Sequence, residues 1–345
     1  MTSNANQRSV RSILRSSNTP EKLNILTFCA HERYEQNLCK TGHEFYSLAV
    51  GKTWDEDYGK IPDNYHPITH IPDYLDFDLI LAHTDCERLV AVYQFLSGGN
   101  NNQSNRTHIP ILRHNHVLPD VRFDIERQKA SIINPVVDFY SFISNYSRDQ
   151  WGFNEQNSIV IEHGIDTDFW CQGAENESRE QYCLSVVNEL PSRDRCCGYN
   201  LWKEISGSVP CSVVGKATGE NAGFSQPAHC IEHLRDIYQT AAVFLNTSIH
   251  SPVPTSLLEA MACGCPVVST ATCMIPEIIE NGVNGIIAND VSDLKFWCRE
   301  LLDKPDLARK IGENGKKTIQ EKYSLERFIQ TWNKAFKLAI GSYRG

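Results

Sequence analysis

Residues 248–285, SIHSPVPTSLLEAMACGCPVVSTATCMIPEIIENGVNG, predict the fold of this chain more strongly than any other stretch. Their pattern is that of a loop, a helix, a tight turn, a buried strand, a second turn and another helix. This order brings the amino end of a helix to the carboxyl edge of a parallel sheet. Unpaired backbone N–H groups and the helix dipole both favour an anion there, so the segment predicts a phosphate site.

Outside this segment, short apolar runs alternate with helical patterns, which indicates βαβ units and a parallel sheet. The alternation stops after Gly164 and then starts again, which predicts two α/β domains in series. Each should hold a doubly wound sheet, and ligands of two such domains bind in the cleft between them. We expect a mobile N-terminus (1–21), a first domain (22–165), a linker (166–180), a second domain (181–325) and a helix returning to the first domain (326–345).

Two further local expectations concern helices. The run CERLVAVYQFL, residues 86–96, has a helical pattern, and the polar loop SGGNNNQSNRT follows it. The tail from Pro305 to about Ile340 is helical in pattern throughout. We expect it to be broken near Gly312–Gly315 and near Tyr323–Ser324, because glycine and turn residues interrupt helices.

Bulk composition limits the function. The chain has 345 residues and a formal net charge of −9, which argues against a nucleic-acid binder driven by phosphate neutralisation. No apolar run approaches the roughly 20 residues that a membrane span needs, so no integral membrane segment is expected. The 13 cysteines are odd in number, and no secretory signal precedes them. We therefore expect a reducing compartment and a cytoplasmic protein.

The runs LLEAMACGCPVVST and PEIIENGVNGIIAND resemble the nucleotide-sugar-binding half of GT-B glycosyltransferases, closest to the retaining family 4. The strings IEHGIDTDFW (161–170) and YSLERFIQTW (323–332) are similar to that family's linker and last crossing segment. The resemblance implies two Rossmann-like domains facing a cleft. It also implies metal-independent transfer of a hexose from a nucleoside diphosphate sugar, with UDP or GDP favoured, to an acceptor hydroxyl. No cofactor is expected.

The donor-binding residues follow from the same segment. The resemblance makes Glu259 the second of the family's two glutamates, which binds the nucleotide ribose. Ser251 stands where the first, sugar-facing glutamate is expected. Thr255 and Ser256 would present backbone N–H groups and hydroxyls to the distal phosphate. The alternative for Glu259 is a capping box with Ser256, and the alternative for Thr255 and Ser256 is simple N-cap chemistry.

Cations are needed to offset the charge that develops on a nucleoside diphosphate leaving group. The family places an Arg and a Lys after the first strand of the second domain, and here Glu189 stands at the Arg position. The loop that follows offers Arg193 and Arg195, and Lys216 follows the next strand. We favour Arg195 and Lys216 as catalytic cations. Each taken singly is better explained as a solvated surface charge, whereas as a set, placed after the right strands, at least one of them is expected to bind phosphate.

In the first domain, ILRHNHVLPD places His114 and His116 at the carboxyl end of a strand. Family members have a histidine at this level that contacts the donor sugar or positions the acceptor, so His114 is the third catalytic candidate. Two histidines at i and i+2 can also share a metal, but no third ligand can be named and no metal is expected. The cysteines of CGC and CCG lack zinc-ribbon spacing and fit small residues in tight turns.

Three functions remain in competition. The first is the retaining glycosyltransferase just described, with an acceptor that could be a glycan, a protein or a small molecule. The second is a non-catalytic nucleotide-sugar-binding protein or a partner subunit of another transferase, which Ser251 and Glu189 favour. The third is a GT-B epimerase or phosphorylase. An epimerase would need several acidic and histidine residues at the cleft, and these cannot be identified here.

Overall fold

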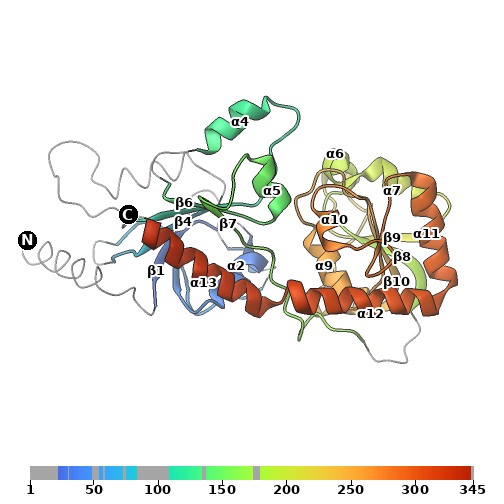
Figure 1. Ribbon diagram of the computed structural model, residues 1–345. Coiled ribbons are helices and arrows are strands. Elements are labelled where there is room, and N and C mark those ends of the chain that lie inside the picture. The colour runs from blue at the N-terminus through green and yellow to red at the C-terminus, as the bar shows by residue number, and fades with distance from the viewer. Residues whose placement is uncertain are drawn as a thin grey trace, which may run out of the picture. The chain divides into compact units, whose positions relative to one another are not determined.

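The computed structural model describes residues 22–29, 31–48, 54–56, 59–72, 75–83, 109–133, 137–173 and 179–342. The chain divides into two compact units (Figure 1). Unit 1 comprises Met1–Ile143, Arg148–Ile161 and Ile329–Gly345, and unit 2 comprises Ser144–Ser147 and Glu162–Phe328. The helix expected over 86–96 lies outside the described residues. No helix among the described residues is long and apolar enough to cross a bilayer.

The sheet of unit 1 has seven parallel strands in the order β3-β2-β1-β4-β5-β6-β7. Its core is formed by apolar residues of β1, β4 and β5, among them Leu26, Ile80 and Ile111, which are inaccessible to solvent. The elements are β1 (Asn24–Thr27), α2 (Glu32–Cys39), β2 (Glu44–Leu48), β3 (Tyr65–Ile68), β4 (Leu79–His83), β5 (Ile111–Asn115), α4 (Ile125–Ile132), β6 (Phe139–Phe142), α5 (Asn145–Gln150) and β7 (Ser158–Val160).

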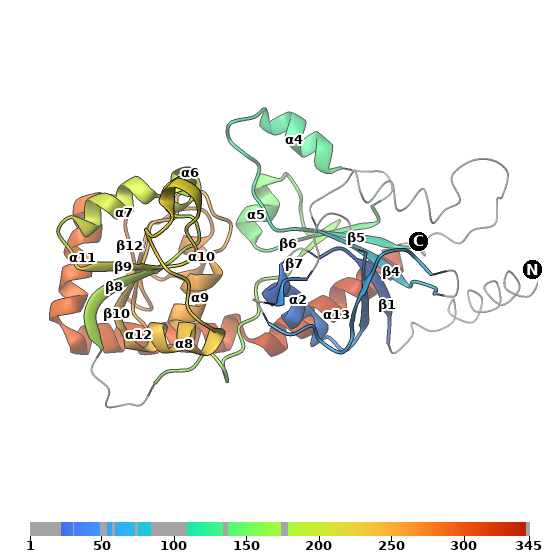
Figure 2. The ribbon, with the colours of Figure 1, turned by 180° about the vertical axis from the view of Figure 1, so that it is seen from behind.

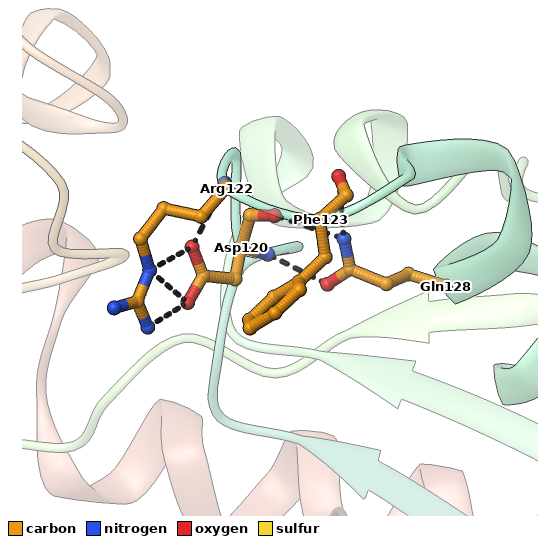
Figure 3. Close-up of polar contacts among 4 residues, drawn as sticks. All are labelled: Asp120, Arg122, Phe123 and Gln128. Carbon is orange, nitrogen blue, oxygen red and sulfur yellow. Dashed lines mark hydrogen bonds and ion pairs between the residues drawn. The ribbon is translucent and has the colours of Figure 1, made fainter.

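The loop between β5 and α4 has a fixed shape. The Gln128 side chain accepts a hydrogen bond from the Asp120 N–H and donates to the carbonyls of Asp120 and Phe123, as Figure 3 shows. The Asp120 carboxylate holds the guanidinium of Arg122, with Nη2 at 2.7 Å from Oδ2. Phe123 is 61% exposed at the tip of this loop.

Helix α13 (Leu325–Ser342) completes unit 1 with its later residues. Trp332 and Phe336 are fully buried. The Phe336 ring packs edge-on to His43 at 5.4 Å, and His43 Nε2 lies 2.8 Å from Asn333 Oδ1. The apolar face of this helix therefore belongs to the core of unit 1, although its residues are remote in sequence from the strands.

A buried polar cluster lies where β4 and β5 end. His114 is fully buried, with Nε2 at 2.9 Å from the Tyr34 hydroxyl and Nδ1 at 2.8 Å from Ser141 Oγ. The Trp332 ring packs against His114 at 4.9 Å. Both ring nitrogens thus have partners within unit 1, which reduces the cost of burying the imidazole.

His83 extends the same cluster. Its Nδ1 lies 2.8 Å from His116 Nε2, and its Nε2 lies 3.3 Å from Oε1 of the fully buried Glu35. Burial lowers the pKa of His83 to about 4. His83 is therefore neutral near pH 7 and gains its proton only in acid.

The sheet of unit 2 has five parallel strands in the order β12-β11-β10-β8-β9. The two all-parallel sheets confirm the α/β fold class. The elements are β8 (Glu180–Val186), η2 (Pro191–Arg193), α6 (Asp194–Cys197), α7 (Tyr199–Ser206), β9 (Cys211–Val214), η3 (Gly219–Asn221), α8 (Ile231–Thr240), β10 (Ala241–Asn246), α9 (Thr255–Ala262), β11 (Val267–Ser269), α10 (Ile275–Ile278), β12 (Ile286–Ile287), α11 (Val291–Asp303) and α12 (Pro305–Lys322).

Helices cover both faces of this sheet. Figures 1 and 2 show α7 and α11 on one face and α8 and α9 on the other. The alternation of β10 explains this, because Val243 and Leu245 join the cluster under α7 and α11 while Phe244 contacts Tyr238 of α8. The order of strands and the two-sided cover are those of a doubly wound sheet.

The amino edge of this sheet is held by Arg179. Its Nη1 donates to the carbonyls of Tyr238 and Ala241, each at 2.8 Å, and its Nη2 donates to the carbonyl of Cys263 at 2.9 Å. One guanidinium therefore binds carbonyls near the end of α8, at the start of β10 and just after α9.

The expected helix break near Gly312–Gly315 is wrong, because α12 runs unbroken from Pro305 to Lys322. Gly312 instead allows close packing: a Cβ added there would lie 2.2 Å from the carbonyl oxygen of Gly264 in the turn after α9. The glycine is present for contact between two backbones. The break at Tyr323–Ser324 is confirmed, since α12 ends at Lys322 and α13 begins at Leu325.

We expect Gly312→Ala to destabilise unit 2, although alanine forms helices better than glycine. The added methyl group has no room beside Gly264, and overpacking of this kind costs about 1–3 kcal/mol. Gly341→Ala is the matched control, because this helical glycine has nothing within 4 Å of its added Cβ. Urea unfolding should show a loss for Gly312→Ala and no loss for Gly341→Ala. Equal midpoints would contradict the packing argument.

The burial of His83 predicts a pH dependence of stability. An unfolded histidine titrates near pH 6.5, so between about 6.5 and about 4 the unfolded chain binds a proton that the folded chain does not. The free energy of unfolding should therefore fall as the pH is lowered through this window, by up to about 1.4 kcal/mol per pH unit for this group.

Urea unfolding at several pH values tests this expectation. His83→Gln should make the dependence shallower by about one proton. Part of the slope should remain, because burial also lowers the pKa of His43. The control is His70→Gln, since His70 is exposed. An unchanged slope in His83→Gln would show that this histidine is not the group that titrates.

Candidate functional site

Most of the predicted site residues meet at one edge of the sheet of unit 2. Parallel strands end at a common edge, and β8, β9 and β10 are neighbours there. The loop after β8 holds Arg193 and leads to Arg195, and Lys216 comes two residues after β9. Ser251, Thr255 and Ser256 follow β10. His114 belongs to unit 1, so it is described separately.

Helix α9 begins at Thr255, with Pro254 as a cap residue that makes no side-chain hydrogen bond to the helix. Ser256 is therefore inside the helix, and the capping box expected between Ser256 and Glu259 is wrong. Thr255 is exposed and Ser256 is half-buried. The amino end of α9 offers its first backbone N–H groups without a competing side-chain cap, as an anion site requires.

Glu259 lies one turn into α9 and is only 2% exposed. The hydroxyl of Tyr238 donates to its Oε2 at 3.0 Å. Tyr238 is itself fully buried, with its ring edge-on to Trp170 at 5.7 Å. The carboxylate is therefore fixed in position by a partner that the sequence did not reveal, because a tyrosine on the apolar face of a helix has the pattern of an ordinary core residue.

The three predicted cations are all exposed side chains. Arg193 ends a short 3-10 turn and donates from Nη1 to the Asn188 carbonyl at 3.4 Å. Arg195 lies in the short helix α6. Lys216 differs in that its main chain is fixed on both sides: its N–H donates to Asn188 Oδ1 at 2.8 Å, and its carbonyl accepts from the Glu189 N–H at 2.7 Å.

The Glu189 carboxylate does not replace a phosphate-binding arginine, because both of its oxygens are hydrogen-bonded to Thr218. Oε1 accepts from Thr218 Oγ1 at 2.8 Å, and Oε2 accepts from the Thr218 N–H at 3.2 Å. Its φ is 56°, a left-handed conformation that only one other non-glycine residue adopts among the described residues, Cys273 at 51°. Such residues are uncommon and cluster at functional sites.

Ser251 is half-buried in the segment between β10 and α9. The neighbouring turns are tied together through the Ser248 carbonyl, which accepts from both Thr270 Oγ1 and Thr272 Oγ1. Behind them, Asn246 Nδ2 donates to Ser269 Oγ at 2.8 Å. This polar network connects the ends of β10 and β11 and sets the backbone path that leads to Ser251.

His114 is remote from solvent, and its two nitrogens are bonded to Tyr34 and Ser141. The half-buried His116, two residues later, lies nearer the surface. The described residues contain no group of three or more His, Cys, Asp or Glu side chains able to hold a metal ion. Every cysteine in the described part of the chain is a free thiol, including Cys263 and Cys265 in the turn after α9.

Part of the same unit resembles known proteins in sequence. Residues 221–318 match the family described as Glycosyl transferases group 1, a range that spans α8, α9 and most of α12. An uncharacterized glycosyltransferase of Methanocaldococcus jannaschii is 35% identical over 208 residues, which are 56% of this chain and 58% of that protein. Alpha-maltose-1-phosphate synthase of Mycolicibacterium smegmatis is 32% identical over 141 residues, which are 37% of this chain and 36% of that protein.

Solved structures resemble the whole chain. Sucrose-phosphate synthase from Thermosynechococcus elongatus has a TM-score of 0.70 at 15% identity, covering 93% of this chain and 100% of that chain. HepE of Anabaena, solved in complex with UDP, has a TM-score of 0.68 at 15% identity, covering 91% and 98%. The alignments with the two curated relatives span only 58% and 36% of those proteins. The chain thus contains a glycosyl transferases group 1 domain and has the fold of the GT-B glycosyltransferases.

Proposed function

We propose that this protein is a retaining glycosyltransferase that moves a hexose from UDP- or GDP-sugar to an acceptor hydroxyl. The observation that supports this most directly is the arrangement around α9. The start of α9 has no side-chain cap, and the buried Glu259 lies one turn inside this helix, within the segment that matches the family. The three cations lie before that segment, in the connections that follow β8 and β9.

Each part of the donor is matched in this proposal to the residues whose chemistry suits it. Glu259, held by Tyr238, would accept hydrogen bonds from the ribose hydroxyls. The backbone N–H groups of Thr255 and Ser256 would receive the distal phosphate. Lys216 and the arginines Arg193 and Arg195 would offset the charge of the diphosphate as it leaves. Positioning and electrostatics supply most of the catalysis in such a site, and no metal or cofactor is needed.

The proposed reaction is a front-face substitution. The acceptor oxygen bonds to the anomeric carbon on the face from which the diphosphate departs, and the bond from that carbon to the phosphate oxygen breaks. The hydroxyl proton passes to the leaving phosphate, so the protein needs no nucleophile. Ser251 in place of a glutamate is compatible with this route, because a serine hydroxyl can still hydrogen-bond a sugar hydroxyl.

His114 has a different role in this proposal from the one expected. A direct contact with the sugar would require its ring to give up Tyr34 or Ser141. We therefore propose that His114 positions the end of β5 and does not itself contact the sugar.

One alternative function is favoured by specific residues. Ser251 and Glu189 stand where the family is expected to have a glutamate and an arginine. A protein that binds a nucleotide sugar without consuming it, or that acts as the partner subunit of another transferase, would fit these substitutions. Tight binding of a UDP- or GDP-sugar without transfer or hydrolysis would select this alternative.

Thermal shift with UDP, GDP, ADP and dTDP tests the nucleotide site. A bound nucleotide raises the melting temperature in proportion to the logarithm of its concentration above the dissociation constant. We expect one nucleotide to stabilise the protein and Glu259→Gln to remove most of that shift, since a neutral amide is a weaker acceptor for ribose hydroxyls. Tyr238→Phe, which removes only the supporting hydroxyl, should reduce the shift less. A full shift in Glu259→Gln would leave Glu259 a structural residue.

Transfer from labelled UDP- or GDP-sugar to a panel of acceptors tests catalysis. Lys216→Met should lower kcat/KM by about ten- to a hundredfold, because a hydrogen bond to a charged group contributes about 1.5–3 kcal/mol. Lys310→Met is the matched control, since Lys310 is exposed on α12, away from the carboxyl-edge loops. Equal activities in the two variants would remove Lys216 from the site. Folded wild-type protein with neither transfer nor donor hydrolysis would contradict the enzyme.

A further inference from the structure

The loops after β8 and β9 are joined by four hydrogen bonds that involve only two residues on each side. Asn188 and Glu189 bind the main chain of Lys216, at 2.8 Å and 2.7 Å. The Glu189 carboxylate then binds Thr218 at its hydroxyl and its N–H, at 2.8 Å and 3.2 Å. Lys216 lies between these contacts, so its backbone is fixed while its side chain is exposed.

The path of Lys216 is restricted from the strand side as well. Gly215 has a φ of 155°, and a Cβ added there would lie 2.2 Å from the Val187 carbonyl. Its own N–H donates to the Gln226 carbonyl at 3.0 Å, and its carbonyl accepts from Ser225 Oγ at 2.8 Å. The end of β9 therefore packs directly on the end of β8, which restricts the position of the Lys216 backbone.

The backbone conformation of Glu189 indicates that the carboxylate, rather than the turn, is the reason for a glutamate at this position. Its left-handed φ of 56° is unfavourable for glutamate and costs nothing for glycine. A glycine would satisfy the turn but would leave Thr218 unbound. A glutamate in this conformation is explained if the link between the two loops is needed.

We propose that Glu189 is a positioning residue that, together with Asn188, holds Lys216 in place for the diphosphate of the donor. This inference rests on the proposed function and deepens it. It explains how a carboxylate can stand where a phosphate-binding arginine is expected: both of its oxygens accept from Thr218, so its charge is satisfied within the protein. The cation is then supplied by the neighbouring strand, in a preorganised position.

The test separates the diphosphate from the nucleoside. Calorimetric titration of the wild-type protein with UDP and uridine, and with GDP and guanosine, gives the gain in affinity due to the two phosphates. Glu189→Gly keeps the backbone conformation and the main-chain bond to Lys216 but removes both carboxylate bonds to Thr218. It should therefore weaken diphosphate binding about five- to tenfold, a fraction of what one charged contact contributes, and leave nucleoside binding unchanged. Glu189→Gln should retain most of the affinity, because its amide can accept from the Thr218 N–H and donate to the Thr218 hydroxyl.

Two further variants complete the experiment. Glu220→Gln removes an exposed carboxylate from the same edge without touching the link, and it should bind UDP or GDP like the wild type. In a Lys216→Met background, Glu189→Gly should have little further effect, because the two residues act as a unit. Equal losses for nucleoside and diphosphate, or additive losses in the double variant, would overturn the inference. A wild-type protein that binds none of the four probes would overturn the proposed function itself.

Discussion

The parallel pairing of β10 with β8 is the constraint on which the second unit depends. Because β8 also pairs with β9, the carboxyl ends of three strands remote in sequence come to one edge. Each strand delivers a different chemical group there: a carboxylate link after β8, a fixed lysine after β9 and an uncapped helix start after β10. The pairing within the sheet is what makes these three groups neighbours.

Local patterns in the sequence sufficed for the fold class and for the elements that build this edge. The run SLLEAMAC predicts a helix that the structure has at Thr255–Ala262, and CSVVGK predicts the strand at Cys211–Val214. The pattern failed where contacts between distant residues decide the outcome. Gly312 looks like a helix breaker by itself, and only the Gly264 carbonyl explains why a glycine stands inside a continuous helix.

The candidate site was less predictable for the same reason. Ser256 and Glu259 have capping-box spacing, but the helix begins at Thr255 with Pro254 as its cap residue, two residues earlier than that box requires. The partners of Glu259 and Glu189 are Tyr238, which precedes its glutamate by 21 residues, and Thr218, which follows by 29. His114 could be placed at the carboxyl end of its strand, whereas its burial among Tyr34, Ser141 and Trp332 depends on a helix from the far end of the chain.

Arg179 gives the two edges of the second sheet different freedom to change. The ends of α8 and α9 and the start of β10 are closed by one guanidinium at the edge opposite to the candidate site. Side chains at the edge of the candidate site can therefore change without loosening the ends of the helices that support them. The edge that carries the candidate site can therefore vary in its chemistry, because the opposite edge of the same sheet is secured by a single side chain.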